Sequence, residues 1–171
     1  QYVFQACGSD ADIVHVNRLI SSEVKLDNYH ILAIPGGFSY GDDIAAGRIF
    51  ATELVLKASG QMRKFVADGK LIIGICNGFQ ALAKTGLLPG ANGAGAAVAS
   101  KKSALHKMTV FDNDSGKYEC RWVYLKRVAD SKCVFTRGMP DIVQLPVAHG
   151  EGKVLFDSEE TRSIVWDNGQ V

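Results

Sequence analysis

The feature that most constrains the fold is a stretch in which an apolar strand turns directly into a helix. Leu71 to Ile75 is an apolar run of strand length; Cys76 ends it, and helix-forming residues follow at once. Gly74 and Gly78 flank the cysteine on either side. A strand that becomes a helix within three residues strains the backbone of the turning residue, and flanking glycines give room for that strain. The pattern predicts a nucleophile elbow, usually described for serine, with cysteine in its place.

An elbow would place Cys76 at the carboxyl end of a central strand and at the amino end of a helix. In that position the helix dipole and the backbone N–H groups favour the thiolate and an adjacent oxyanion. The alternative is a buried structural cysteine, because free cysteine is among the most buried residue types. The paired glycines and the direct change from strand to helix favour the nucleophile.

Composition is that of an ordinary globular domain. The 171 residues are enough for one domain with a sizeable core. The net charge of +1 is too small to attract polyanions strongly, so no nucleic-acid partner is expected. The apolar runs are far shorter than a membrane span, so no membrane association is expected either. The four cysteines form no C-x-x-C pair and have no histidine at zinc spacing, which favours reduced thiols, a cytoplasmic location and no metal site.

Continuous apolar runs alternate with helical patterns in the first half of the chain. Residues 2–7 read as the end of a helix, and the runs at 12–16 and 29–34 as buried strands. Residues 45–66 carry apolar side chains at helical spacing, with Gly60 as a candidate interruption. Continuous apolar runs are typical of parallel strands covered on both faces. We therefore expect an α/β fold with an open, mostly parallel sheet and helices on both faces.

The second half of the chain has an antiparallel character. Residues 108–112 and 118–128 flank Asn113-Asp114-Ser115-Gly116, which is a hairpin signal. Further strands are expected at 134–135, at 143–147 and, with a turn, at 164–171. The parallel sheet should therefore have an antiparallel edge. Neither an internal repeat nor an interdomain linker is visible, which predicts a single domain over 1–171.

Polar, glycine-punctuated loops follow three of the predicted strands, at 35–42, 74–80 and 148–152. In an open parallel sheet, the loops at the carboxyl ends of the strands meet at a common crevice where ligands bind. Pro35-Gly36-Gly37-Phe38 would bring backbone N–H groups close to Cys76, and the N–H of Asn77 would join them. That is what an oxyanion site for acyl transfer requires. The alternative for the two glycines is a tight turn that needs their backbone angles.

A nucleophilic cysteine needs a base, which is normally a histidine oriented by a carboxylate. His15 and His30 lie within apolar runs and are interpreted as core or surface residues, whereas His106 lies in a basic, flexible stretch. From spacing alone, His149 with Glu151 is the natural dyad. The alternative is a structural loop histidine, and the residues by themselves leave the choice open.

Five motifs stand in order along nearly the whole chain: Ile34-Pro-Gly-Gly-Phe-Ser-Tyr-Gly-Asp42, Gly74-Ile-Cys-Asn-Gly-Phe-Gln80, Gly86-Leu-Leu-Pro-Gly90, Arg121-Trp-Val123 and Pro146-Val-Ala-His-Gly-Glu-Gly152. Together they resemble the glutaminase subunit, or domain, of phosphoribosylformylglycinamidine synthase, a class I glutamine amidotransferase of purine biosynthesis. The motif Gly-x-Cys-x-Gly alone indicates a class I amidotransferase or a relative. Together with the first motif, it indicates a much smaller group of proteins.

The resemblance implies the flavodoxin-like class I glutamine amidotransferase fold and the hydrolysis of glutamine through a thioester on Cys76. The ammonia would pass to a synthetase that makes formylglycinamidine ribonucleotide from formylglycinamide ribonucleotide, which makes the pair an ATP-dependent C–N ligase. ATP and Mg would belong to the synthetase, and this chain would carry no cofactor. The implied partners are glutamine and the synthetase subunit, with or without a small accessory subunit.

The resemblance also implies roles for residues around the cysteine. Gly37 and the Asn77 N–H would form the oxyanion site, and Gln80 would help to hold the substrate. The backbone of Phe38 and Ser39 would lie near the glutamine.

The resemblance implies a different base from the one that spacing suggests. In class I amidotransferases the catalytic histidine and glutamate come from a His-Pro-Glu segment near the carboxyl terminus, and these 171 residues contain no such segment. His149 and Gly150 would instead lie in a loop that helps to bind the glutamine backbone, with Glu151 in the same pocket. The domain is therefore expected to lack its first strand and its His-Pro-Glu segment.

Two other functions stay open. One is another elbow-cysteine protein of the same superfamily, such as a protease or a stress protein. The other is a binding or regulatory module that keeps the elbow but has lost the triad.

Overall fold

The structure is a computed structural model that describes residues 1–38, 47–90 and 107–171. Its elements, in chain order, are α1 Tyr2–Ala6, α2 Val16–Ile20, a 3₁₀ turn Leu26–Asn28, β1 Ile31–Ile34, α3 Arg48–Lys57, α4 Ser59–Ala67, β2 Leu71–Gly74, α5 Asn77–Ala83, β3 Met108–Asp112, β4 Glu119–Lys126, a 3₁₀ turn Val134–Thr136, β5 Ile142–His149, β6 Glu151–Phe156 and α6 Glu159–Asp167. Ser39, with its predicted place near the glutamine, and His106 lie outside the described residues. Within the described ranges, no helix is both long enough and apolar enough to cross a membrane.

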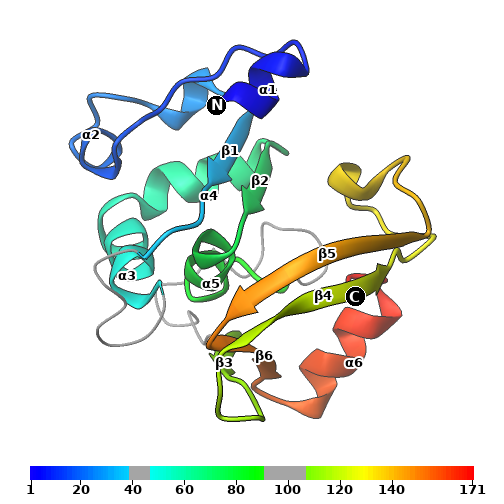
Figure 1. The fold of residues 1–171 in the computed structure, drawn as a ribbon. Helices are drawn as coiled ribbons and strands as arrows, with labels where there is room; N and C mark the ends of the chain where they lie inside the picture. Colours follow the sequence, from blue (N-terminus) through cyan, green and yellow to red (C-terminus); the bar gives the residue numbers. More distant parts are fainter. Residues whose placement is uncertain (39–46, 91–106) are drawn as a thin grey trace.

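Strands β1 and β2 form the parallel part of the fold (Figure 1). Their register ends with Ile34 beside Gly74, so the loops that follow the two strands leave the sheet at the same edge. Both α4 and α5 contact β2. The expected α/β class, with parallel strands alternating with helices, is confirmed. Parallel pairing among the described residues joins β1 to β2, and the antiparallel part of the fold is larger than the sequence suggested.

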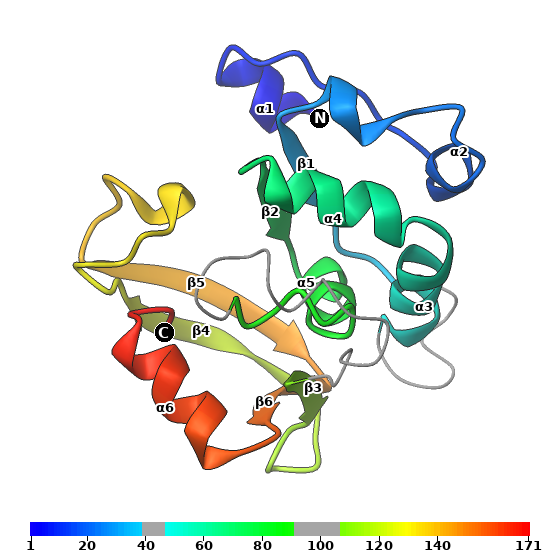
Figure 2. The ribbon, with the colours of Figure 1, turned by 180° about the vertical axis from the view of Figure 1, so that it is seen from behind.

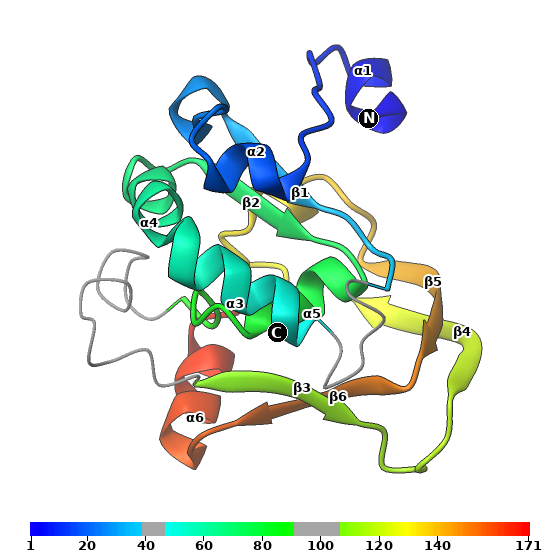
Figure 3. The same cartoon turned by 90° about the vertical axis from the view of Figure 1, so that its left-hand side faces the viewer.

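The four later strands form two antiparallel two-stranded sheets, which follow one another as a ribbon with a corner in it. Strand β4 pairs with β5, and Glu119 lies opposite His149 at one end of that pair. Strand β3 pairs with β6, and Asp112 lies opposite Glu151. On one side of the ribbon the chain passes from β5 to β6 almost directly, whereas on the other side the segment 113–118 separates β3 from β4. The extra residues turn the corner, and Figure 3 shows the two halves of the ribbon at an angle to each other.

The predicted hairpin at 113–116 is therefore wrong, although both flanking strands exist. The N–H of Gly116 donates to the carbonyl of Asn113 (2.9 Å), so a tight turn does form. A turn signal specifies the local backbone conformation, but it does not specify which strands the two flanking strands pair with. Here β3 and β4 pair with a second continuous stretch of chain instead of with each other.

The strand expected at 12–16 is also wrong. Residues 11–15 have no sheet partner, the side chain of Ile13 is 78% exposed, and α2 begins at Val16. The ring of His15 accepts a hydrogen bond from the N–H of Asn17 (3.2 Å) and so caps the helix. An apolar run of five residues is too short for its period to decide between strand and helix.

The carboxyl-terminal expectation of a strand at 164–171 is wrong, because α6 occupies the first half of that segment. The helix starts with Ser158, whose side chain accepts a hydrogen bond from the N–H of Thr161 (3.1 Å). Thr161 and Val165 are buried and lie one turn apart. The helix start, Ser158 followed by Glu159 and Glu160, is a recognisable capping pattern in the sequence. Two smaller corrections concern the expected strand at 134–135, which is a 3₁₀ turn, and the helix interruption, which falls at Ala58 instead of Gly60.

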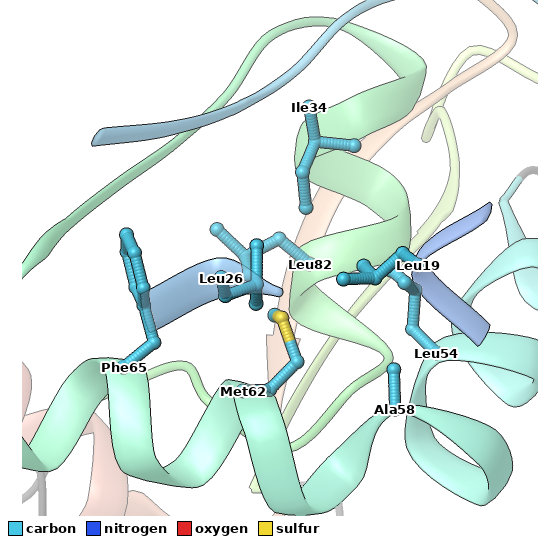
Figure 4. Close-up of a cluster of buried hydrophobic side chains, with 8 residues drawn as sticks. All are labelled: Leu19, Leu26, Ile34, Leu54, Ala58, Met62, Phe65 and Leu82. Atoms are coloured by element: carbon cyan, nitrogen blue, oxygen red, sulfur yellow. The ribbon is translucent and has the colours of Figure 1, made fainter. Parts of the chain in front are cut away.

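Helix α5 is packed against both parts of the fold. The larger core gathers buried side chains from the amino-terminal half of the chain (Figure 4): Leu19, Leu26, Ile34, Leu54, Ala58, Met62, Phe65 and Leu82. Leu82 brings α5 into this core, whereas the neighbouring Ala83 packs with Met108 and Val110 of β3 in a second cluster. Seen from behind in Figure 2, α5 accordingly lies between β1–β2 and the ribbon. The helix that follows Cys76 is thus held from two sides.

Candidate active site

Cys76 has the strained backbone that an elbow requires. Its φ is +54° and its ψ is −118°, a combination that side-chain-bearing residues rarely adopt. Its carbonyl accepts hydrogen bonds from the N–H groups of Phe79 (2.9 Å) and Gln80 (3.1 Å), so α5 starts directly at the cysteine. The cysteine is exposed and forms no disulfide. It is therefore not a buried structural cysteine.

The flanking glycines let the start of α5 approach the ends of the parallel strands. A Cβ on Gly74 would lie 2.7 Å from the carbonyl oxygen of Gly78. A Cβ on Gly78 would overlap the carbonyl oxygen of Ile34 and would lie 2.7 Å from that of Pro35. Real Cβ atoms do not come so close to backbone atoms. The sharp strand-to-helix turn therefore depends on both glycines, as the sequence pattern predicts.

The loop after β1 lies directly against the thiol. A Cβ built on Gly36 would be 3.0 Å from the Cβ of Cys76 and 3.7 Å from its Sγ. The next residue, Gly37, has a φ of +137°, and Phe38 is 81% exposed. The backbone of Gly36 therefore borders the side chain of Cys76, and the loop that would supply N–H donors to an oxyanion site begins beside the sulfur. The tight-turn interpretation of Gly37 also holds, because its φ favours glycine.

The first turns of α5 are tied to the start of β6. Asn77 is buried, and its side-chain Nδ2 donates to the Oε1 of Gln80 (3.1 Å). The Nε2 of Gln80 in turn donates to the carbonyl of Glu151 (2.9 Å). One turn further along, the ammonium of Lys84 pairs with the carboxylate of Glu151 (3.4 Å). These contacts place the predicted substrate loop beside the elbow helix.

His149 ends β5 and is held on two sides. Its Nδ1 lies 3.0 Å from the Oδ1 of Asn113. The ring also lies over Gly152, where a Cβ would be 2.7 Å from Nε2 and closer still to two other ring atoms. Of the dyad that spacing suggests, the histidine thus contacts Asn113 and the carboxylate of Glu151 contacts Lys84. The geometry gives the dyad no support.

A negative charge lies near this histidine. Glu119 is opposite His149 in the ribbon, and its carboxylate accepts a hydrogen bond from the hydroxyl of Ser115 (2.7 Å). That hydrogen bond lowers the pKa of Glu119 below its usual value, and the guanidinium of Arg121 lowers it further. Glu119 is therefore ionised at neutral pH.

The remaining histidines in the described part of the chain lie elsewhere. His15 caps α2, and His30 is an exposed residue whose carbonyl accepts from the N–H of Leu71 (3.1 Å). Sequence reasoning missed Lys84 and the contact of Asn113 with His149. Lys84 lies one turn after Gln80 on the same helix face, which was a usable signal. Asn113 had a turn signal but nothing that pointed to a residue so far along the chain.

A family model for the CobB/CobQ-like glutamine amidotransferase domain matches residues 1–171. The chain belongs to this family. Similar amidotransferases are named phosphoribosylformylglycinamidine synthase subunit PurQ, which confirms the resemblance found in the sequence. The PurQ of Dehalococcoides mccartyi is 48% identical over 92% of this chain and 58% of that protein. The PurQ of Methanothermobacter thermautotrophicus is 36% identical over 98% of this chain and 70% of that protein.

The fold of this amidotransferase is shared with a solved structure described as PurLQS from Thermotoga maritima. The sequence identity is 34% and the TM-score 0.60, over 80% of this chain and 55% of that chain. The chain spans about three fifths of the length of most of the curated relatives it matches. The PurQ of Treponema denticola, for example, is 39% identical over 98% of this chain and 62% of its own length.

Proposed function

We propose that this chain is the glutaminase component of phosphoribosylformylglycinamidine synthase. The observation that carries the proposal is the strained, exposed Cys76, with the backbone of Gly36 packed against its side chain. An elbow cysteine beside a glycine loop suits acyl transfer, and family membership selects the amide of glutamine as the acyl donor.

In the proposed reaction the thiolate of Cys76 attacks the side-chain amide carbon of glutamine and forms a C–S bond. The carbonyl electrons move onto oxygen, and the N–H groups of Gly37 and Asn77 hold this oxyanion. The C–N bond then breaks and the nitrogen takes up a proton. Ammonia departs, and the acyl group stays on Cys76 as a thioester. Attack by water on the thioester releases glutamate and restores the thiol.

The substrate pocket would be shared between the two loops that the structure brings to α5. Phe38 would line one side of this pocket, and His149 with Gly150 would line the other, with Gln80 of α5 between them. The hydrogen bond from Gln80 to the carbonyl of Glu151 supports this arrangement, because it joins the helix to the second loop. The proton-transfer histidine and its glutamate would come from the His-Pro-Glu segment of a longer protein.

The ammonia would serve a synthetase partner that uses ATP and Mg to convert formylglycinamide ribonucleotide into formylglycinamidine ribonucleotide. A small accessory subunit would complete some of these complexes. The similarity to a structure described as PurLQS supports a multi-subunit assembly. A cytoplasmic location is supported by the four cysteines, which are all free.

The decisive experiment replaces Cys76 with alanine in the complete enzyme complex. Glutamine-dependent synthesis should fall by roughly a thousandfold or more, because no thioester can form, while synthesis from added ammonia should continue. Cys120→Ala, which removes another exposed thiol, should leave both activities unchanged. Full glutamine-dependent activity in the Cys76→Ala complex would overturn the proposal.

A labelling experiment separates this function from the two alternatives. A glutamine-mimicking electrophile should modify Cys76 faster than it modifies Cys7, Cys120 or Cys133. A protease or stress protein of the same superfamily would show hydrolytic activity without a synthetase and no preference for the glutamine mimic. A binding module would be labelled slowly and uniformly at all four thiols.

A further inference from the structure

Asn113 uses every polar atom of its side chain at the corner of the ribbon. Its Nδ2 donates to the carbonyls of His149 (2.9 Å) and Lys117 (2.9 Å). Its Oδ1 lies 3.0 Å from the Nδ1 of His149. Its backbone N–H donates to the carbonyl of Gly150 (3.1 Å). One residue therefore holds the histidine ring and the two backbone carbonyls of the predicted substrate loop.

These partners fix the orientation of the amide. The carbonyls of His149 and Lys117 can only accept hydrogen bonds, so the NH₂ group of Asn113 must face them. The Oδ1 of Asn113 then faces the imidazole, and this oxygen can only accept. The Nδ1 of His149 must therefore carry a proton.

The second ring nitrogen is left as an acceptor. When Nδ1 of a neutral imidazole is protonated, Nε2 keeps its lone pair. No hydrogen bond joins the Nε2 of His149 to any residue that the structure describes. The ring cannot tilt freely, because it lies over Gly152 with no space for even a Cβ between them.

The loop that carries this acceptor is anchored at the elbow. Glu151 accepts a hydrogen bond from Gln80 and pairs with Lys84, and both partners belong to the helix that begins beside Cys76. Asn113 holds the loop from the other side. The position and the protonation pattern of His149 are thus fixed by two different elements, α5 and the corner of the ribbon.

We propose that Asn113 is a positioning residue that holds His149 with Nδ1 protonated, so that Nε2 accepts a hydrogen bond from the α-ammonium group of glutamine. The proposal rests on the proposed glutaminase function. Glutamine has two donor groups, its side-chain amide and its α-ammonium, whereas its carboxylate can only accept. The amide must lie at Cys76 for the reaction, so the α-ammonium is the donor that remains for this loop.

The protonation pattern can be measured without any activity. In the full chain labelled with ¹⁵N in the imidazole rings, long-range ¹H–¹⁵N spectra distinguish the two neutral tautomers. His149 should show the Nδ1–H form. His15 is an internal control that should show the opposite tautomer. Its Nδ1 accepts a hydrogen bond from the N–H of Asn17, so in the neutral ring Nε2 must carry the proton. His149→Gln and His15→Gln variants assign the signals, and an Nε2–H pattern for His149 would overturn the proposal.

Variants test whether Asn113 sets this pattern. Asn113→Leu and the smaller Asn113→Ala both remove the acceptor, and His149 should lose its preference for the Nδ1–H form in each. Retention of that form in a variant whose other amide signals are unchanged would show that Asn113 does not control the ring. Since the tautomer of the unmodified chain is decisive alone, failure of one variant to fold leaves the proposal testable.

Recognition of the ammonium group is tested with paired reagents. An electrophilic glutamine mimic should label Cys76 roughly 10- to 100-fold faster than the same mimic without its amino group, as expected for a hydrogen bond to a charged donor. This ratio should fall towards one in Asn113→Ala and in His149→Phe. An unchanged ratio in both variants would overturn the role of Nε2, whereas failure to label Cys76 with either reagent would refute the glutaminase function itself.

Discussion

The Cα of Gly78 lies against the carbonyl group of Ile34, at the point where the elbow helix meets the end of the first parallel strand. A Cβ at this glycine would overlap the oxygen of that carbonyl and would lie 2.7 Å from its carbon. The obstruction is backbone on both sides, so no side-chain rotation can relieve it. The approach of helix to strand is consequently possible for glycine alone.

Gly78→Ala should lower the free energy of unfolding by about 1–3 kcal/mol, the usual range for overpacking a fixed site. Gly60→Ala is the matched control, because Gly60 lies in α4 with nothing within 4 Å of its added methyl group. There alanine should stabilise the protein by about 0.4–1 kcal/mol through helix propensity and chain entropy. Denaturant unfolding of both variants measures the difference. Equal stabilities would show that the helix shifts freely away from Ile34.

Cys76→Gly should be more stable than Cys76→Ala by about 1 kcal/mol. The positive φ of Cys76 strains any residue with a Cβ, and glycine removes that strain. Both variants lack the thiol, so the comparison isolates the backbone. Thermal unfolding of the two proteins gives the answer. A higher melting temperature for the alanine variant would mean that the elbow stores no strain.

Lys84 and Glu151 should be coupled more strongly than an exposed ion pair. Their side chains are only 13% and 22% exposed, which reduces the screening of their charges by water. A double-mutant cycle with Lys84→Met and Glu151→Gln should give a coupling energy of about 1–2 kcal/mol, between the values typical of exposed and buried pairs. The same cycle for Lys57 and Glu53, a more exposed pair on α3, should give about 0.5 kcal/mol or less. Similar coupling in both pairs would contradict the expectation.

Asp157 makes the start of α6 sensitive to acid. The hydroxyl of Thr161, and then that of Ser158, hold the pKa of Asp157 below its usual value. A lowered pKa in the folded state stabilises the protein above the usual carboxyl pKa, and this stabilisation is lost as the pH falls through the lower, folded value. In Thr161→Val the pKa should move up towards that of a free carboxyl.

NMR titration of the side-chain carboxyl of Asp157 measures this shift. Ser163→Ala, a change at an exposed position of the same helix, should leave the titration unaltered. If Asp157 titrates identically in Thr161→Val, the hydroxyl is not the cause of its low pKa.

The elbow and its surroundings were predictable because short-range chemistry determines them. Gly74 and Gly78 give a local steric signal around Cys76, and neither depends on how distant parts of the chain pack. The strands at 31–34 and 71–74 likewise follow from continuous apolar runs bounded by turn residues. Spacing alone suggested His149 as the catalytic base. The family resemblance added the interpretation of His149 as a residue of the substrate pocket.

The ribbon could not be predicted in the same way. The signal at 113–116 specified a turn correctly, but the partners of the strands on either side lie far along the chain. No local pattern of Asn113 indicates that its side chain meets His149. The helix at 159–167 was within reach, because Ser158 and the acidic residues after it form a recognisable start that the apolar Ile164-Val165-Trp166 concealed.

The ribbon's register also has a consequence for how the chain folds. Strands β4 and β5 are joined by residues 127–141, whereas β3 and β6 precede and follow that pair in the sequence and lie much further apart along the chain. Closing the shorter loop costs less entropy, so we expect the inner pair to form first and to bring the ends of the outer pair together. Asn113 stands between the two pairs. Its hydrogen bonds to His149, Gly150 and Lys117 would then form at the step that joins an already paired hairpin to the rest of the ribbon, before the site beside Cys76 is complete.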